Sequence, residues 1–365
     1  MRLTTTLSRY IGRQFLIWFS VAFGGLVGLI LLLDTVELMR RASGKPDATL
    51  DIVMSMALLK LPNMAQEAVP FAILFGGMAA FWRLARSSEI VVVRSAGVSA
   101  LQFLLPVLVI AFSIGVFKVA VFNPFASVTL SRFEHIEGKY LRGRSSLLAV
   151  SSSGVWLRQA DDFGQAVVHA REVSPQGMEM RDVIIFMYEG EDRFVQRIDA
   201  ATAVLEDGYW LLNDTWITSP EQPSRYEPEY MVQTDLTVLK IQDSFATPAS
   251  ISFWDLPAFI DTLEKAGFSG VRHRLYWHSL LSDPFLLCAM VLFSAGFALR
   301  AAPRRTAVVW TMGGGILTGF LLYFLSDVVA ALGQTASVPV ALAAWTPAVA
   351  AILIGASLLI HVEEG

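Results

Sequence analysis

The sequence is poor in charge and almost without cysteine. Only 16% of its 365 residues are Asp, Glu, Lys or Arg, against about 25% in soluble domains. The net charge of −4 is too small to provide a basic field, so we expect no nucleic-acid partner. The single cysteine, Cys288, excludes an intrachain disulfide and any CxxC metal or redox motif. We expect it to be a small buried hydrophobe.

Motifs for ATP binding and hydrolysis are also absent. Gly44-Lys45 and Gly138-Lys139 are followed by Pro and Tyr and lack the glycine-rich loop of a P-loop. The five histidines are scattered and none forms H-E-x-x-H, and G-x-S-x-G is missing, so a metalloprotease or a serine hydrolase of these classes is not predicted. We expect no cofactor and no metal in this chain.

What the sequence has instead is six long apolar stretches, with 54% hydrophobic residues and a mean hydropathy of +0.54. Each is about the length that an α-helix needs to cross a hydrocarbon core of roughly 30 Å. They cover residues 14–33, 61–82, 101–122, 276–299, 306–332 and 338–360. The first is too long for a signal-peptide h-region and lacks an A-x-A-like cleavage site, so we expect a permanent helix. The sequence predicts an integral membrane protein.

The loops predict its orientation, because cytoplasmic loops are rich in Lys and Arg. With the N-terminus in the cytoplasm, the inner segments hold nine arginines: Arg2, Arg9, Arg13, Arg83, Arg86, Arg94, Arg300, Arg304 and Arg305. The short outer segments hold four cations: Arg40, Arg41, Lys45 and Lys60. Both termini are therefore predicted in the cytoplasm, with the polar block 123–273 on the other side.

The polar block has the pattern of β-structure. Residues 183–188 and 194–198 are short runs of β-forming residues, and Asp207-Gly208 lies between two further runs as a hairpin signal. Strands at roughly ten-residue spacing suggest a sandwich or jelly roll. The proline-containing segments 219–223 and 227–228 are interpreted as loop.

Two further details of the block are predicted. Residues 253–267 have helical spacing and a glycine stop, which indicates a short helix leading back to the membrane. Four aromatic residues are expected in the β core rather than on lipid: Phe186, Tyr188, Trp210 and Trp216. The predicted architecture is three transmembrane helices in 1–122, an inserted β-jelly-roll domain in 123–273, and three transmembrane helices in 274–365.

Two alternatives to transport remain open from the residues alone. Asp283 and Asp327 both lie in apolar stretches, so an intramembrane aspartyl hydrolase is conceivable, although polar contacts between helices are the simpler interpretation. A membrane-anchored assembly scaffold is the other. An anchor needs only one helix, and six helices with interior prolines and charges favour a moving cavity.

The segment 83–99 is the sharpest local signal. It is charged and amphipathic, it ends near Gly97, and it lies between the second and third apolar stretches on the predicted cytoplasmic side. Such a segment is either an ordinary positively charged loop or a coupling helix that inserts into a cytoplasmic motor.

Residues 88–97, Ser-Glu-Ile-Val-Val-Val-Arg-Ser-Ala-Gly, resemble the S-E-[IL]-V-x-x-x-x-[AS]-G motif of the lipopolysaccharide export permeases of Gram-negative bacteria, the LptF/LptG family. Residues 7–13, 68–77 and 314–320 are similar to that family's start, second helix and fifth helix. The R-Y-I-G start and residues 148–157 look more like the LptG branch than the LptF branch.

The resemblance implies a set of partners and a place in the cell. The chain would be a non-catalytic inner-membrane subunit that pairs with an LptF-like paralogue on two copies of an LptB-like cytoplasmic ATPase, which uses the ATP. A single-helix periplasmic jelly-roll protein, LptC-like, would receive lipopolysaccharide and feed the bridge that serves outer-membrane biogenesis. The large domain would be periplasmic.

Several charged residues are candidates for the lipid head group. Arg40 and Arg41 oppose the positive-inside trend, which favours contacts to head-group phosphates, with ordinary snorkelling as the alternative. Asp34 and Glu37 lie at helical spacing for ion pairing with these arginines, and Asp34 departs from the family, which often has a basic residue there. Lys118, near the expected outer end of the third helix, is a weaker candidate.

In the segment 83–99 we expect Glu89 to contact the ATPase, with Arg86 and Arg94 beside it and Gly97 ending the helix. A carboxylate there can pair with an arginine or accept backbone N–H bonds in the ATPase groove. A solvated surface charge is the alternative.

Overall fold

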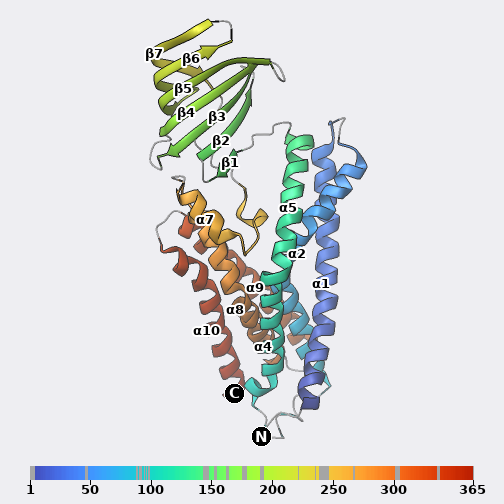
Figure 1. Cartoon of the computed structure of the whole chain (residues 1–365). Coiled ribbons are helices and arrows are strands. Elements are labelled where there is room, and N and C mark those ends of the chain that lie inside the picture. The colour runs from blue at the N-terminus through green and yellow to red at the C-terminus, as the bar shows by residue number, and fades with distance from the viewer. Residues whose placement is uncertain are drawn as a thin grey trace.

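The computed structural model describes residues 5–45, 48–87, 89, 93, 95, 97, 99–142, 148–151, 154–161, 164–174, 179–189, 193–220, 222–234, 236–237, 246–265, 268–300, 305–334 and 338–364. A bundle of long helices carries a curved β-sheet at one end, and both chain termini lie at the opposite end (Figure 1).

Six helices among the described residues are long and apolar enough to cross a membrane. They are α1 (Thr5–Ala42), α2 (Leu50–Arg86), the column that begins with α4 (Ala100–Phe117), α8 (Val271–Arg300), α9 (Arg305–Gln334) and α10 (Val340–Glu364). Five of the six contain a whole predicted apolar stretch, and α10 begins two residues inside the predicted stretch 338–360. Most continue beyond the stretch because a helix satisfies its backbone groups outside the bilayer as well as inside. The predicted six-helix membrane protein with an inserted β domain is confirmed.

The third column is longer than we predicted. A π-helical turn, η1 (Lys118–Phe122), joins α4 to α5 (Asn123–Glu137) and a second turn, η2 (Gly138–Arg142), although we had expected the helix to end at residue 122. The reason is that α5 has an apolar face of its own. Leu130 and Phe133 pack in one buried cluster with Leu38 of α1 and Met56 of α2.

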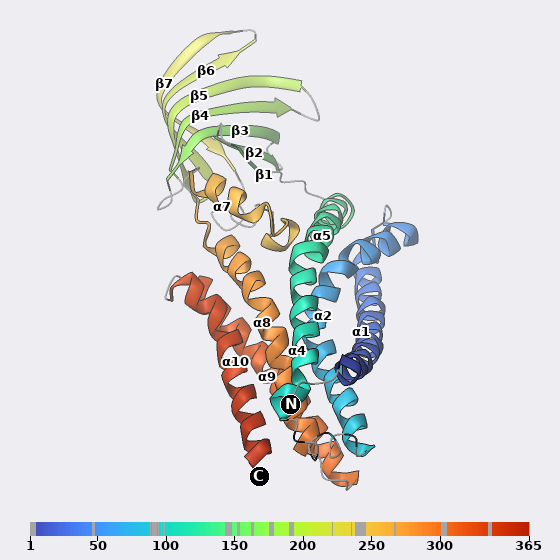
Figure 2. The ribbon, with the colours of Figure 1, turned by 60° about the horizontal axis from the view of Figure 1, so that its bottom comes forward.

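Two close helix crossings involve α2, which runs beside α1 (Figure 2). A Cβ on Gly76 would lie 2.6 Å from the Cα of Phe19 in α1, so α1 and α2 touch backbone to backbone. On another side, a Cβ on Gly319 of α9 would lie 2.3 Å from Leu74. The helix α2 therefore packs closely on α1 and also touches α9, which packs mainly on α8 and α10.

The inserted domain is one antiparallel sheet whose seven described strands follow sequence order. They are β1 (Leu148–Ser151), β2 (Gly154–Asp161), β3 (Gly164–Val173), β4 (Glu179–Glu189), β5 (Arg193–Glu206), β6 (Tyr209–Ser219) and β7 (Gln222–Gln233). The predicted turn at Asp207-Gly208 joins β5 to β6, and Gly208 has the positive φ of 90° that such a turn requires.

A short helix connects the sheet to the bundle. The turn η3 (Pro248–Ser250) precedes α7 (Leu256–Lys265), which lies within the predicted helix 253–267, while residues 266 and 267 fall outside the described residues. Leu263 of α7 and Phe268 after it pack in the core of the sheet, so α7 closes one side of the β domain above α8.

Three predictions for the β domain were wrong. The expected loop 219–223 is shorter than predicted, because Ser219 ends β6 and Gln222 and Pro223 begin β7. The segment Glu227-Pro228 is not a loop, because it lies in β7, an edge strand, where a missing N–H costs little. Of the four aromatic residues expected in the β core, Trp210 lies in it and is 1% exposed. Phe186 and Tyr188 are only half-buried and lie outside the core cluster, because the inward positions of β4 are those of Val183 and Ile185. Trp216 is 52% exposed, and the cause is a break in the alternation of β6. Asp214 has a positive φ of 53°, and the inward positions change from 210 and 212 to 215 and 217.

Candidate functional site

Charged side chains gather at the end of the bundle nearer the sheet, where α1 and α5 end and α2 begins. Arg40 donates hydrogen bonds to Glu37 at 2.7 and 2.8 Å, and its side chain is 74% exposed. Arg41 donates to Glu137 of α5 at 2.6 Å, and that carboxylate is only 6% exposed. Of the two arginines, Arg40 is therefore the one that faces outward. Arg41 instead links α1 to α5 through its ion pair with Glu137.

Asp34 does not pair with an arginine of its own helix. Its carboxylate accepts a hydrogen bond from Lys60 of α2 at 2.6 Å, with side chains 7% and 25% exposed, and Lys60 also lies 5.6 Å from the ring centre of Phe133. Asp34 thus forms a largely buried ion pair that links α1 to α2. Its role in binding substrate stays a prediction.

Lys118 is not near the outer end of its helical column, as we had expected, because α5 carries the column on to Arg142. Its Nζ lies 2.9 and 3.0 Å from the two carboxylate oxygens of Asp283 in α8. The two side chains are 10% and 12% exposed. This is a buried ion pair between helices. Of Asp283 and Asp327, the two aspartates in the apolar stretches, it gives Asp283 a structural role.

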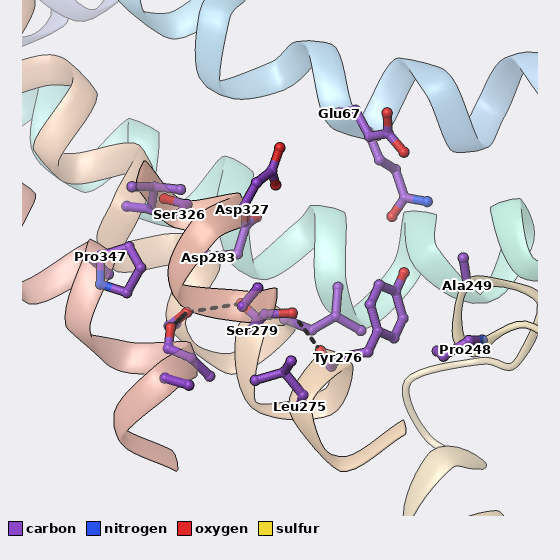
Figure 3. A pocket seen from close by; sticks show the side chains of 18 of the residues that line it. Glu67, Pro248, Ala249, Leu275, Tyr276, Ser279, Asp283, Ser326, Asp327 and Pro347 are labelled. Atoms are coloured by element: carbon purple, nitrogen blue, oxygen red, sulfur yellow. Dashed lines mark hydrogen bonds between the residues drawn. The ribbon is translucent and has the colours of Figure 1, made fainter. Parts of the chain in front are cut away.

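A cavity of about 510 Å³ opens between α2, α8, α9 and α10. It lies on the sheet side of the crossing between α2 and α9, because its α2 residues precede Leu74 and its α9 residues follow Gly319. Glu67 projects into it from α2, and Asp327 and Tyr276 face it from the other helices (Figure 3). Neither Glu67 nor Asp327 makes an ion pair or hydrogen bond with any described residue, and both are exposed. Unpaired carboxylates at this depth require water or a polar partner, although most of the remaining lining of the cavity is apolar.

The outer helices α1 and α9 are the least covered of the six. None of the apolar window of α1 and 17% of that of α9 is buried, against 67% for α2 and 72% for α8. Long apolar side chains stand free on both, among them Leu32 at 60%, Leu33 at 58%, Phe320 at 62% and Phe324 at 60% exposed. The chain thus presents an apolar surface on each side of α2.

The segment after α2 begins with a defined cap. The backbone N–H of Ser87 donates to the carbonyl oxygen of Arg83 at 3.0 Å, and its hydroxyl donates to Glu89 at 2.8 Å. Tyr10 of α1 donates to the same carboxylate at 3.3 Å. Arg86 lies 5.4 Å from the ring centre of Trp82. The hydrogen bonds from Ser87 and Tyr10 therefore hold Glu89 beside the N-terminal end of α1.

The rest of that segment is described only in part. Gly97 has a φ of 80°, which suits the predicted helix end. Arg94 lies outside the described residues. The coupling role of Glu89, Arg86, Arg94 and Gly97 stays a prediction.

Sequence reasoning missed Lys60 and Glu137 as partners, and it missed Glu67 altogether. The first two carry no sequence signal, since their partners lie 26 and 96 residues away. Glu67 did carry one, because an ionisable residue inside a membrane helix is a functional candidate by itself.

Comparisons with known proteins agree with this layout. The model of the family described as lipopolysaccharide export system permease LptF/LptG matches residues 9–361. The chain is 27% identical over 350 residues to the lipopolysaccharide export system permease protein LptG of Haemophilus influenzae, covering 91% of each chain. It is 25% identical over 365 residues to LptG of Escherichia coli K12, covering 97% of this chain and 98% of that one. The chain therefore belongs to the lipopolysaccharide export system permease family, LptF/LptG.

Proposed function

We propose that the chain is the permease subunit of an ABC transporter that extracts lipopolysaccharide from the inner membrane and passes it to a periplasmic bridge. The observation that carries the proposal is the pair of uncovered apolar helices, α1 and α9, on either side of α2. Removing several acyl chains from a bilayer costs about 0.8 kcal/mol per CH₂ unless another apolar surface receives them. The apolar faces of α1 and α9 supply that surface.

The head group would bind at the sheet end of α1. Arg40 is 74% exposed there, against 36% for Arg41 and 25% for Lys60. Its present partner, Glu37, lies on the same helix and is itself half exposed. A phosphate can displace such a partner, because exposed ion pairs contribute little and arginine binds phosphate with two hydrogen bonds. Arg41 would support the site through its bond to Glu137.

The orientation and the partners are part of the same proposal. With nine arginines on the side of the N-terminus, both termini would be cytoplasmic and the sheet periplasmic. A paralogous, LptF-like permease would stand opposite α1 and α9 and enclose a transport cavity between its own helices and their apolar faces. Two LptB-like ATPases would hydrolyse ATP below it, because the sequence has no P-loop, and an LptC-like jelly-roll protein would continue from the sheet.

Arg40→Gln is expected to reduce lipopolysaccharide photocrosslinking to the purified complex about tenfold, since a hydrogen bond to a charged group contributes about 1.5–3 kcal/mol. Glu37→Gln is the matched control. It removes the carboxylate that competes for Arg40, so crosslinking should stay equal or rise. A loss of crosslinking in Glu37→Gln as large as in Arg40→Gln would contradict the head-group role.

Glu89→Ala is expected to weaken retention of the co-expressed ATPase about tenfold, because a charge-assisted contact in the ATPase groove is lost. Glu89 also accepts the hydroxyl of Ser87, so Ser87→Ala is the control that breaks this internal bond and keeps the carboxylate. Copurification of the ATPase and its ATP hydrolysis should fall in Glu89→Ala alone. If ATPase copurification and ATP hydrolysis fell equally in both variants, Glu89 would act only in the local helix cap with Ser87 and not in contact with the ATPase.

The hydrolase alternative finds less support in the geometry. Asp283 and Asp327 do line one cavity, but the carboxylate of Asp283 is neutralised by Lys118, whereas an aspartyl dyad shares a proton between two carboxylates. A scaffold role does not explain the uncovered faces of α1 and α9. Transport remains the function that the arrangement supports best.

A further inference from the structure

A second hollow lies on the far end of α1 from the sheet. This groove, of about 750 Å³, runs between α1 and α4, which lie side by side near the N-terminus (Figure 1). Its floor forms where α4 comes close to Gly12, since a Cβ there would lie 2.7 Å from Ile110. Its principal lining residues are Arg9, Arg13, Leu16, Ile17, Val21 and Ile110.

The groove is divided along its length into a cationic and an apolar part. Arg9 and Arg13 are one helical turn apart and so share a face. Beyond them Leu16, Ile17 and Val21 are 41%, 46% and 62% exposed. The distance from Arg13 to Val21 is about 12 Å along the helix, which is enough to hold the upper part of an acyl chain.

The two arginines have no partner in the described part of the chain. Neither makes an ion pair or hydrogen bond there, although Arg40, Arg41, Lys60 and Lys118 are all paired with carboxylates. Both side chains are exposed. They are free to bind an anion at the end of an apolar groove.

We propose that this groove binds an anionic phospholipid of the cytoplasmic leaflet, with its phosphate on Arg9 and Arg13 and an acyl chain along Leu16 and Val21. Charge complementarity favours a lipid over a partner helix, because a membrane helix seldom supplies the carboxylates that two arginines require, whereas basic pockets between helices on this side bind anionic head groups. The inference rests on the proposed orientation. The bound lipid is distinct from the cargo, whose proposed head-group site is at the opposite end of α1.

The test uses a fluorophore in the groove of the full chain. Ser20→Cys places one thiol at the apolar end, and Cys288→Ala removes the only native cysteine. In nanodiscs of phosphatidylcholine, phosphatidylglycerol with a spin label on its acyl chain should quench the fluorophore at about tenfold lower mole fraction than labelled phosphatidylcholine. Adding Arg9→Gln and Arg13→Gln should abolish this preference. Arg132→Gln, an exposed arginine of α5, should leave it intact.

Three results would overturn the proposal. One is equal quenching by both lipids in the parent chain, and another is an unchanged preference in the double arginine variant. The third is loss of lipid quenching when the chain is purified with its partners, which would show that a helix fills the groove. The assay contains neither lipopolysaccharide nor ATP, so its outcome is independent of whether the chain exports lipopolysaccharide.

Discussion

Lys118→Ala is expected to lower the free energy of unfolding by about 3–5 kcal/mol, the range for breaking a buried ion pair. The change leaves the carboxylate of Asp283, which is only 12% exposed, without its cation in an apolar bundle. The effect should be large because the pair joins α8 to the π-helical turn η1, next to the contact of Gly115 with Pro284, where a Cβ would lie 2.6 Å from the Pro284 Cα. Denaturant titration of the purified chain in detergent measures it.

A double variant separates the charge from the packing. Lys118→Met with Asp283→Leu removes both charges and keeps apolar volume, so most of the lost stability should return. Lys265→Ala is the control for an exposed pair, since Lys265 and Asp261 are 75% and 62% exposed and such pairs contribute little. If Lys118→Ala is no more destabilising than Lys265→Ala, the pair is not buried in the folded protein.

Gly76→Leu is expected to separate α1 from α2 and to cost about 3 kcal/mol or more of unfolding free energy, at or above the upper end for overpacking. The reason is that the obstruction is backbone. The added Cβ would lie 2.6 Å from the Cα and 2.7 Å from the N of Phe19, and neither atom can rotate away. The whole of α1 would have to move, and the uncovered face that it offers to substrate would move with it.

Gly28→Leu is the matched control in α1, because a Cβ there would meet nothing within 4 Å. Leucine also has the higher helix propensity, so the isolated chain should keep its stability. The two variants are compared by unfolding midpoint and by copurification of the partner subunits. Equal midpoints would mean that α1 does not pack on Gly76 as described.

The helices could be predicted because the bilayer fixes their length and composition, and the hairpin at Asp207-Gly208 because its backbone needs a positive φ at Gly208. The sequence did not predict that α5 extends the third helical column. The apolar face of α5, with Leu130 and Phe133, is too narrow to appear as an apolar stretch in the sequence. Trp216 was misplaced because a single irregular residue, Asp214, reverses the alternation of a strand.

In the candidate site, too, some features could be predicted from the sequence and others could not. Arg40 could be singled out, since a cation on the side predicted to be periplasmic departs from the positive-inside rule, and its partner lies on the same helix. The pairing of Asp34 with Lys60 could not be predicted from the sequence, because it depends on how α1 and α2 pack against each other. Local patterns identify the chemical groups, and tertiary packing decides which of them remain free.

The most direct test of the transport account is site-specific photocrosslinking from the uncovered helix faces of the purified complex. A photoreactive amino acid at Leu32 of α1 or Phe320 of α9, which are 60% and 62% exposed, should crosslink lipopolysaccharide, and the yield should change when ATP is added. The same probe at Leu353 of α10, 65% exposed, should give no ATP-dependent crosslink. If all three positions crosslink alike and ATP changes none of them, α1 and α9 do not form a transport cavity.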